Sequence, residues 1–218
     1  MHLLRVVIAD RPGSLGALAT ALGLAEADIV GVDVIERRDD GRVVDDILVD
    51  LPHGRLPDAL VSACNSVDGA EVEFVRFYPH RGGLQRDLQA VEAMTESPLR
   101  ADAILVDLAP DVFRADWALI MERSDDGELA LVHRSQAAPE DLDGVSAPWL
   151  PVTRARRLLD PIDWASSWGE TAAAAVTIGG PNCVLVVARR GGPEFLSSEL
   201  ARLGHLVNLA RAIRSGSD

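Results

Sequence analysis

The 218-residue sequence contains no lysine and two cysteines, Cys64 and Cys183. All 21 of its basic residues are therefore arginines, which excludes Schiff-base chemistry and the lysine-dependent phosphate loop of many nucleotide-binding proteins. Two cysteines so far apart in sequence provide no disulfide framework, a pattern typical of a reducing compartment. The five histidines have no metal-ligand spacing with one another or with the cysteines, so the sequence predicts no metal site.

Long apolar runs and basic patches are missing as well. No apolar run reaches the ~20 residues that span a bilayer, and the chain starts in a strand-like pattern without a charged-then-apolar leader. The formal net charge of −13 disfavours binding to nucleic acid or to an anionic membrane, because phosphates would be repelled. We therefore expect a cytoplasmic protein that binds neither. With 48% hydrophobic residues, the chain can bury a sizeable core.

Hydrophobic periodicity predicts an α/β (α+β) fold in two domains. In the first part, strands are expected at 3–9, 28–37, 42–51 and 72–77, and helices at 14–25 and 56–66. The turn Asp39-Asp40-Gly41 indicates a hairpin between the second and third strands. The resulting order, β-α-β-β-α-β, is the ferredoxin-like supersecondary pattern. The polar, glycine-containing segment 80–83 is the expected linker between domains at 1–79 and 84–218.

The loop between the first strand and the first helix, Asp10-Arg11-Pro12-Gly13-Ser14-Leu15, is the candidate site. Pro12 fixes one backbone angle, Gly13 allows a tight turn, and Ser14 is a candidate N-cap of the helix. The first amides of a helix have no intrahelical partner, so the loop can bind an anion such as a carboxylate. An ordinary strand-to-helix turn without a ligand has the same pattern.

The second domain is expected to contain three hairpin or helical blocks around an irregular segment. Its expected elements are helices within 84–96 and 99–113, a hairpin at 117–132, a hairpin at 172–188 and a final helix at 197–213 capped by Ser197 or Ser198. Residues 136–170 are irregular, with a short helical candidate at 154–159. They contain Trp149, Trp164 and Trp168, which could line a binding pocket or cap the core. Arginines at 154–157 could meet an anionic ligand or lie on a solvated helix face.

The first 78 residues resemble an ACT domain, and they are most similar to the ACT repeats of nitrogen-sensing uridylyltransferases. The resemblance rests on the loop 10–15, Asp28-Ile29, the Gly41 turn and the segment Val44-Asp45-Asp46-Ile47-Leu48-Val49, which occur in order at the family's spacing. It implies a ferredoxin-like regulatory module that commonly dimerises and binds an amino acid between the first loop and the start of the second strand. The ligand-binding residues it implies are Asp10, Pro12, Gly13, Ser14 and Leu15, facing Asp28, Ile29 and Val30.

The chain departs from this family at two of these positions. Serine-binding members often carry asparagine where this chain has Asp10 and Asp28. Two carboxylates attract an ammonium group and repel a carboxylate. If an amino acid binds here, we expect its ammonium group toward Asp10 or Asp28 and its carboxylate toward the amides after Gly13.

Residues from about 84 to 214 resemble a GAF-type domain. The resemblance lies in the first helix, the hairpin at 117–132 and the ending 172–213, which includes Val184-Leu185-Val186-Val187 and Phe195-Leu196. It implies a small-molecule sensor or dimerisation module. The cyclic-nucleotide signature of some members is absent from this sequence, so the resemblance names no ligand.

These patterns together predict a regulatory protein that is not an enzyme and carries no cofactor. No nucleophile–base pair can be assembled from the sequence, and the Gly-x-Ser-x-Gly elbow does not occur. We expect the first domain to bind a small molecule, an amino acid, and to pass the signal through a homodimer or a protein partner. The alternative is a dimerisation or scaffold protein that binds no ligand.

Overall fold

The computed structural model describes residues 1–52, 54–78, 86–158 and 163–216. The chain divides into two compact units, unit 1 at Met1–Leu84 and unit 2 at Gln85–Asp218. The expected linker at 80–83 lies outside the described residues.

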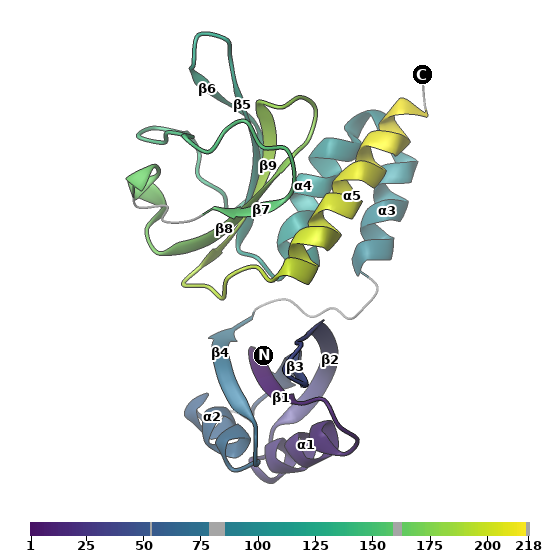
Figure 1. Cartoon of the computed structure of the whole chain (residues 1–218), viewed down its shortest axis with the longest axis vertical. Helices are drawn as coiled ribbons and strands as arrows, with labels where there is room; N and C mark the ends of the chain where they lie inside the picture. Colours follow the sequence, from purple (N-terminus) through teal and green to yellow (C-terminus); the bar gives the residue numbers. More distant parts are fainter. Residues whose placement is uncertain (53, 79–85, 159–162, 217–218) are drawn as a thin grey trace. The chain divides into compact units, whose positions relative to one another are not determined.

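Unit 1 has the element order β-α-β-β-α-β that the periodicity predicts. Its elements are β1 (His2–Ala9), α1 (Ser14–Leu24), β2 (Asp28–Arg37), β3 (Arg42–Asp50), α2 (Asp58–Asn65) and β4 (Glu71–Phe77). The sheet is antiparallel throughout with the strand order β2-β3-β1-β4, which makes β2 an edge strand. Both helices cover the same face of this sheet (Figure 1).

The core of unit 1 follows from the two-residue period of its strands. Alternate side chains of β1 and β3 point to the face that the helices cover, and there they meet the apolar side chains of α1 and α2. The buried members of this layer are Leu4, Val6, Ile8, Leu18, Leu22, Val43, Ile47, Val49, Leu60 and Cys64. One face of the sheet is thus sealed by apolar packing, which stabilises the unit.

Unit 2 is a five-stranded antiparallel sheet with helices on one face (Figure 1). Its elements are α3 (Arg86–Glu96), η1 (Pro98–Arg100), α4 (Ala101–Val112), β5 (Trp117–Arg123), β6 (Leu129–Arg134), β7 (Arg156–Leu158), η3 (Ser166–Trp168), β8 (Thr171–Thr177), β9 (Cys183–Arg190) and α5 (Ser197–Ser215). The strand order is β6-β5-β9-β8-β7. Both predicted hairpins are present, as β5–β6 and β8–β9.

The short helix expected at 154–159 is wrong. Residues Arg156–Leu158 instead form β7 at the edge of the sheet, where Arg156 pairs with Ala175 and Leu158 pairs with Ala173 of β8. The unpaired backbone groups along β8 provide hydrogen-bond partners that a three-residue segment would lack as a helix. Tertiary pairing therefore overrides the local pattern.

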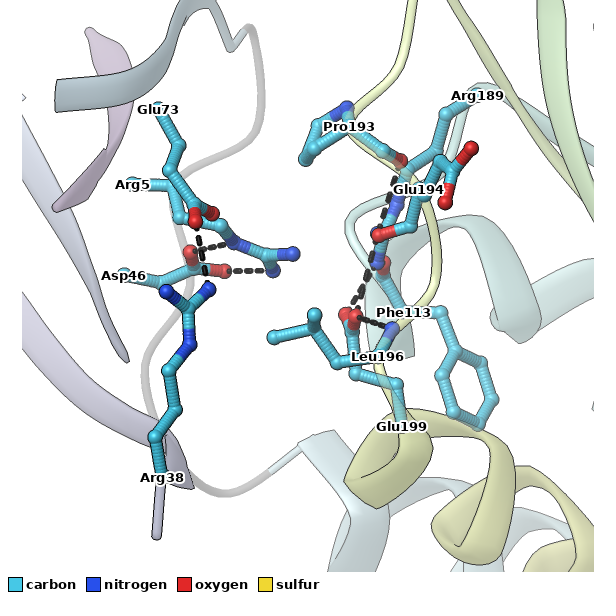
Figure 2. A network of polar contacts seen from close by, with 10 residues as sticks. All are labelled: Arg5, Arg38, Asp46, Glu73, Phe113, Arg189, Pro193, Glu194, Leu196 and Glu199. Carbon is cyan, nitrogen blue, oxygen red and sulfur yellow. Dashed lines mark hydrogen bonds and ion pairs between the residues drawn. The ribbon is translucent and has the colours of Figure 1, made fainter. Parts of the chain in front are cut away.

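The start of α5 is fixed by ion pairing and not by a serine cap. Glu199 accepts a hydrogen bond from the Leu196 amide at 2.8 Å, and Leu196 is the N-cap in place of the expected Ser197 or Ser198. The same carboxylate lies 2.5 Å from Nη2 of Arg189 in β9, which also donates to the carbonyl of Phe113 at 2.6 Å (Figure 2). This arrangement joins α5, β9 and the end of α4.

The packing of α1 is tested by two leucines on the same helix. Leu22 is fully buried, whereas Leu24 is 83% exposed. We expect Leu22→Ala to lower the free energy of unfolding of unit 1 by about 2–5 kcal/mol, because it removes buried methyl groups and leaves a cavity. The control Leu24→Ala should change it by less than about 0.5 kcal/mol. Urea titration followed by circular dichroism measures both, and equal effects would contradict this packing.

Candidate functional site

The loop between β1 and α1 is held against the β2–β3 hairpin. The Asp10 amide donates to the Gly41 carbonyl at 2.9 Å. Gly13 has φ +95°, a left-handed conformation that suits glycine, and it is the N-cap of α1. Ser14 is the first helical residue and not the cap that the sequence predicts. No side chain in the described part of the chain caps α1, so its first amides remain open to a ligand.

Asp10 carries the first charge beside these amides. Its Oδ2 lies 3.1 Å from Nε of Arg37 at the end of β2, and the Arg37 side chain is 69% exposed. Exposed ion pairs of this kind contribute little to stability, because water competes for both groups. The Asp10 carboxylate can therefore exchange Arg37 for a ligand cation at small cost.

Asp28, Ile29 and Val30 lie at the opposite end of the sheet from this loop. Both β1 and β2 are antiparallel to β3, so β1 and β2 run in the same direction. Val49 of β3 consequently pairs with His2 at the start of β1 and with Ile29 at the start of β2, whereas Asp10 follows the end of β1. One copy of the chain does not bring the two predicted halves of the site together.

Asp45 of β3 is a charged residue within reach of the loop that sequence reasoning did not select. It is directly opposite Val6 of β1 and Val34 of β2. Since Val43 and Ile47 lie in the apolar layer under the helices, the intervening Asp45 points to the same face. It is 2% exposed, and its Oδ1 has no hydrogen-bond partner among the described residues. An acid in the apolar phase of a strand was the available signal.

The neighbouring Asp46 shows what a satisfied acid looks like in the same strand. It points to the other face of the sheet, where its two oxygens accept from Arg5 of β1 at 2.7 and 2.9 Å (Figure 2). This bidentate geometry is the strong form of an arginine–carboxylate pair. Asp45 has no such arginine on its own face.

Burial raises the pKa of Asp45, and the negative charges of Asp46 and Asp10 raise it further, whereas Arg37 lowers it. The helix packed over this face cannot compensate, because Ser14–Leu24 contains no charged residue. The loop Asp10–Leu15 together with Arg37 and Asp45 is hereafter the α1 corner. It combines uncapped amides with two carboxylates.

The tryptophans of unit 2 pack against one another instead of lining an open pocket. Trp168 lies edge-to-face with Trp117 at a centroid distance of 4.8 Å and with Trp164 at 5.1 Å, and Trp149 meets Trp164 at 5.3 Å. They belong to the apolar cluster on the sheet face opposite the helices. The expectation that they cap the core is the one the packing supports.

Two open grooves lie along the irregular segment of unit 2. One, of about 790 Å³, runs between the β5–β6 turn and residues 140–148, and its rim carries Glu128, Glu140, Asp141 and Asp143. The other, of about 630 Å³, is lined by residues 151–157, which include the arginines at 154, 156 and 157. Arg157 pairs with Glu194 at 2.5 Å.

Metal and thiol chemistry find no prepared group in the described residues. They contain no group of three or more histidine, cysteine, aspartate or glutamate side chains arranged to hold a metal ion. Both cysteines are free, and burial raises the pKa of Cys64 to about 11, which keeps its thiol protonated and unreactive. None of the described helices is long and apolar enough to cross a membrane.

No family model and no curated protein matches the sequence. Similar solved structures include the GAF domain of an Acinetobacter phosphoenolpyruvate-protein phosphotransferase, at 15% identity and TM-score 0.44, covering 61% of this chain and 92% of that one. The GAF domain of a putative sensor histidine kinase from Pseudomonas syringae pv. tomato has 14% identity and TM-score 0.44, with 61% and 87% covered. A GAF domain/HD domain protein from Geobacter sulfurreducens has 17% identity and TM-score 0.40, with 61% and 95% covered. At this level of similarity, function has to be argued from this chain's own side chains.

The raised pKa of Asp45 predicts a pH-dependent gain from its replacement. The folded state binds the Asp45 proton more tightly than the unfolded state, so stability is lost as pH rises through the raised pKa. Asp45→Asn removes this loss. We expect its stability relative to the natural chain to increase from about pH 3 to about pH 7, with the difference closing at the acid end.

Urea titrations at several pH values measure this difference. Asp68→Asn is the matched control, because it changes the net charge equally at an exposed turn. A difference between the Asp45 variant and the natural chain that does not vary with pH would contradict the assignment.

Proposed function

We propose that this protein is a regulatory sensor in which unit 1 is a ferredoxin-like domain of ACT type that binds an amino acid at the α1 corner. The β-α-β-β-α-β order and the strand order β2-β3-β1-β4 support this architecture. One observation supports the ligand: amides without a side-chain cap at the start of α1 lie in one corner with the carboxylates of Asp10 and Asp45.

The two kinds of group suit the two charges of an amino acid. The ligand carboxylate accepts hydrogen bonds from the amides after Gly13, where the helix dipole also favours negative charge. The ligand ammonium then faces the carboxylate side of the corner. Gly13 leaves room for this approach, because a Cβ built there has no atom within 4 Å.

A second copy of the chain supplies the missing half of the site in this proposal. β2 is an edge strand, and its side chains Val30 and Val34 are half exposed. If two copies pair antiparallel along the full length of β2, Asp28 of one copy lies opposite the partner's Arg37. The charges are complementary, and Asp28–Val30 then reaches the α1 corner of the other copy. A ligand that contacts both copies favours the pair, and that shift is the signal.

Unit 2 is GAF-like in this proposal and acts as a further sensor, dimerisation or partner-binding module. Its own antiparallel sheet and the helices on one face support this role. We propose no catalytic activity, since the two thiols are held protonated and the groove residues form acidic or arginine-lined rims.

Thermal unfolding in the presence of each of the twenty amino acids at millimolar concentration tests the proposal. A ligand that binds only the folded state raises the Tm in proportion to its saturation of the site. We expect at least one amino acid to raise the Tm of the natural chain, and Gly13→Trp to abolish that rise by filling the corner. Gly69→Trp is the control, because Gly69 also has positive φ and open space but follows α2. No shift with any amino acid would contradict the proposal.

The exposed edge of β2 also favours the alternative, a scaffold that pairs without a ligand. Sedimentation velocity separates the two. A sensor should dimerise more strongly when the stabilising amino acid is present, whereas a scaffold should form the same dimer with and without it.

A further inference from the structure

The buried carboxylate of Asp45 needs an explanation that its own unit does not provide. A charged group taken out of water is costly unless it is paired, and buried polar atoms are nearly always hydrogen-bonded. Asp45 is 2% exposed with an unpartnered Oδ1, in a layer that is otherwise apolar. Valine would fill the same place in the strand without this cost.

The charges that face Asp45 from the surrounding elements leave it without a dedicated cation. α1 has no charged residue, α2 contributes Asp58, and the facing residue of β1 is Val6. In the loop, Arg11 is exposed to solvent and Asp10 is itself an acid. Arg37 is paired with Asp10. The net field at Asp45 from its acidic neighbours favours a cation.

A cation can approach Asp45 from the open edge of the sheet. Val34 lies directly opposite Asp45 on the same face, and it is 52% exposed. The helices therefore cover β3 but leave β2 partly open. Leu15, in the first turn of α1, is also exposed, at 38%. A small cation entering over Val34 has one strand spacing to cross, about 5 Å.

We propose that Asp45 binds the ammonium group of the ligand and thereby restricts the α1 corner to ligands with a free amine. This inference rests on the proposed function and specifies its ligand class: α-amino acids, but not their N-acyl derivatives or the corresponding keto acids. Asp45 supplies an ionised acceptor in a site of low polarity, where a charge-assisted hydrogen bond is stronger than in water. Asp10 at the rim then guides the cation inward.

The test measures binding by isothermal titration calorimetry and thermal shift for the twenty amino acids and their N-acetyl derivatives. We expect an amino acid that stabilises the natural chain to lose its effect when acetylated. Asp45→Asn should weaken its binding by about 10-fold or more, because the ammonium is left facing a neutral amide. Asp39→Asn, which changes the net charge equally at the exposed hairpin turn, should bind within about 2-fold of the natural chain.

Equal binding by Asp45→Asn, or equal binding of the acetylated derivative, would overturn the inference while leaving the proposed function intact. Ethylammonium chloride, compared with sodium chloride at the same concentration, separates the opposite case. If no amino acid binds but ethylammonium stabilises the natural chain and not Asp45→Asn, the proposed function fails and Asp45 is still the cation site. If neither an amino acid nor ethylammonium has an effect, both are wrong.

Discussion

The apolar layer between the sheet and the helices of unit 1 depends on a strict alternation in β3, and Asp45 interrupts it. Val43 and Ile47 on either side pack into this layer. Asp46 has the opposite orientation and already binds Arg5. Asp45 must therefore either keep its proton or obtain a cation from outside the unit. The cost of burying this acid couples the stability of the unit to whatever occupies the α1 corner.

Much of the fold could be predicted from the sequence because it is encoded locally. Alternation and turn residues indicated the order of elements in unit 1 and the hairpins of unit 2. The site was less predictable. Asp10 and Asp28 were expected to face each other, but their separation depends on strand direction and register, which no local pattern contains. Asp45 and Asp46 are adjacent letters in the sequence, and only the pairing of the strands shows that one is satisfied and the other is not.

Unit 2 shows the same limit of local patterns. The segment 136–170 lacks a regular period because its tryptophans serve as a cover for one face of the sheet, so their spacing follows the shape of that face. Arg156–Leu158 became a strand because β8 had an open edge. The helices on the other face were predictable, since α5 combines a regular apolar stripe with the acid Glu199 that fixes its start.

The ionisation state of Asp45 tests the account most directly. Carbon-13 labelling of aspartate carboxyl groups allows the Asp45 signal to be followed by NMR, with Asp45→Asn identifying it. In the free protein at mildly acidic pH, the signal should be that of a protonated acid while exposed aspartates are ionised. Addition of the stabilising amino acid should convert it to the ionised form. An Asp45 signal that is already ionised without ligand, or that the ligand leaves unchanged, would contradict the account.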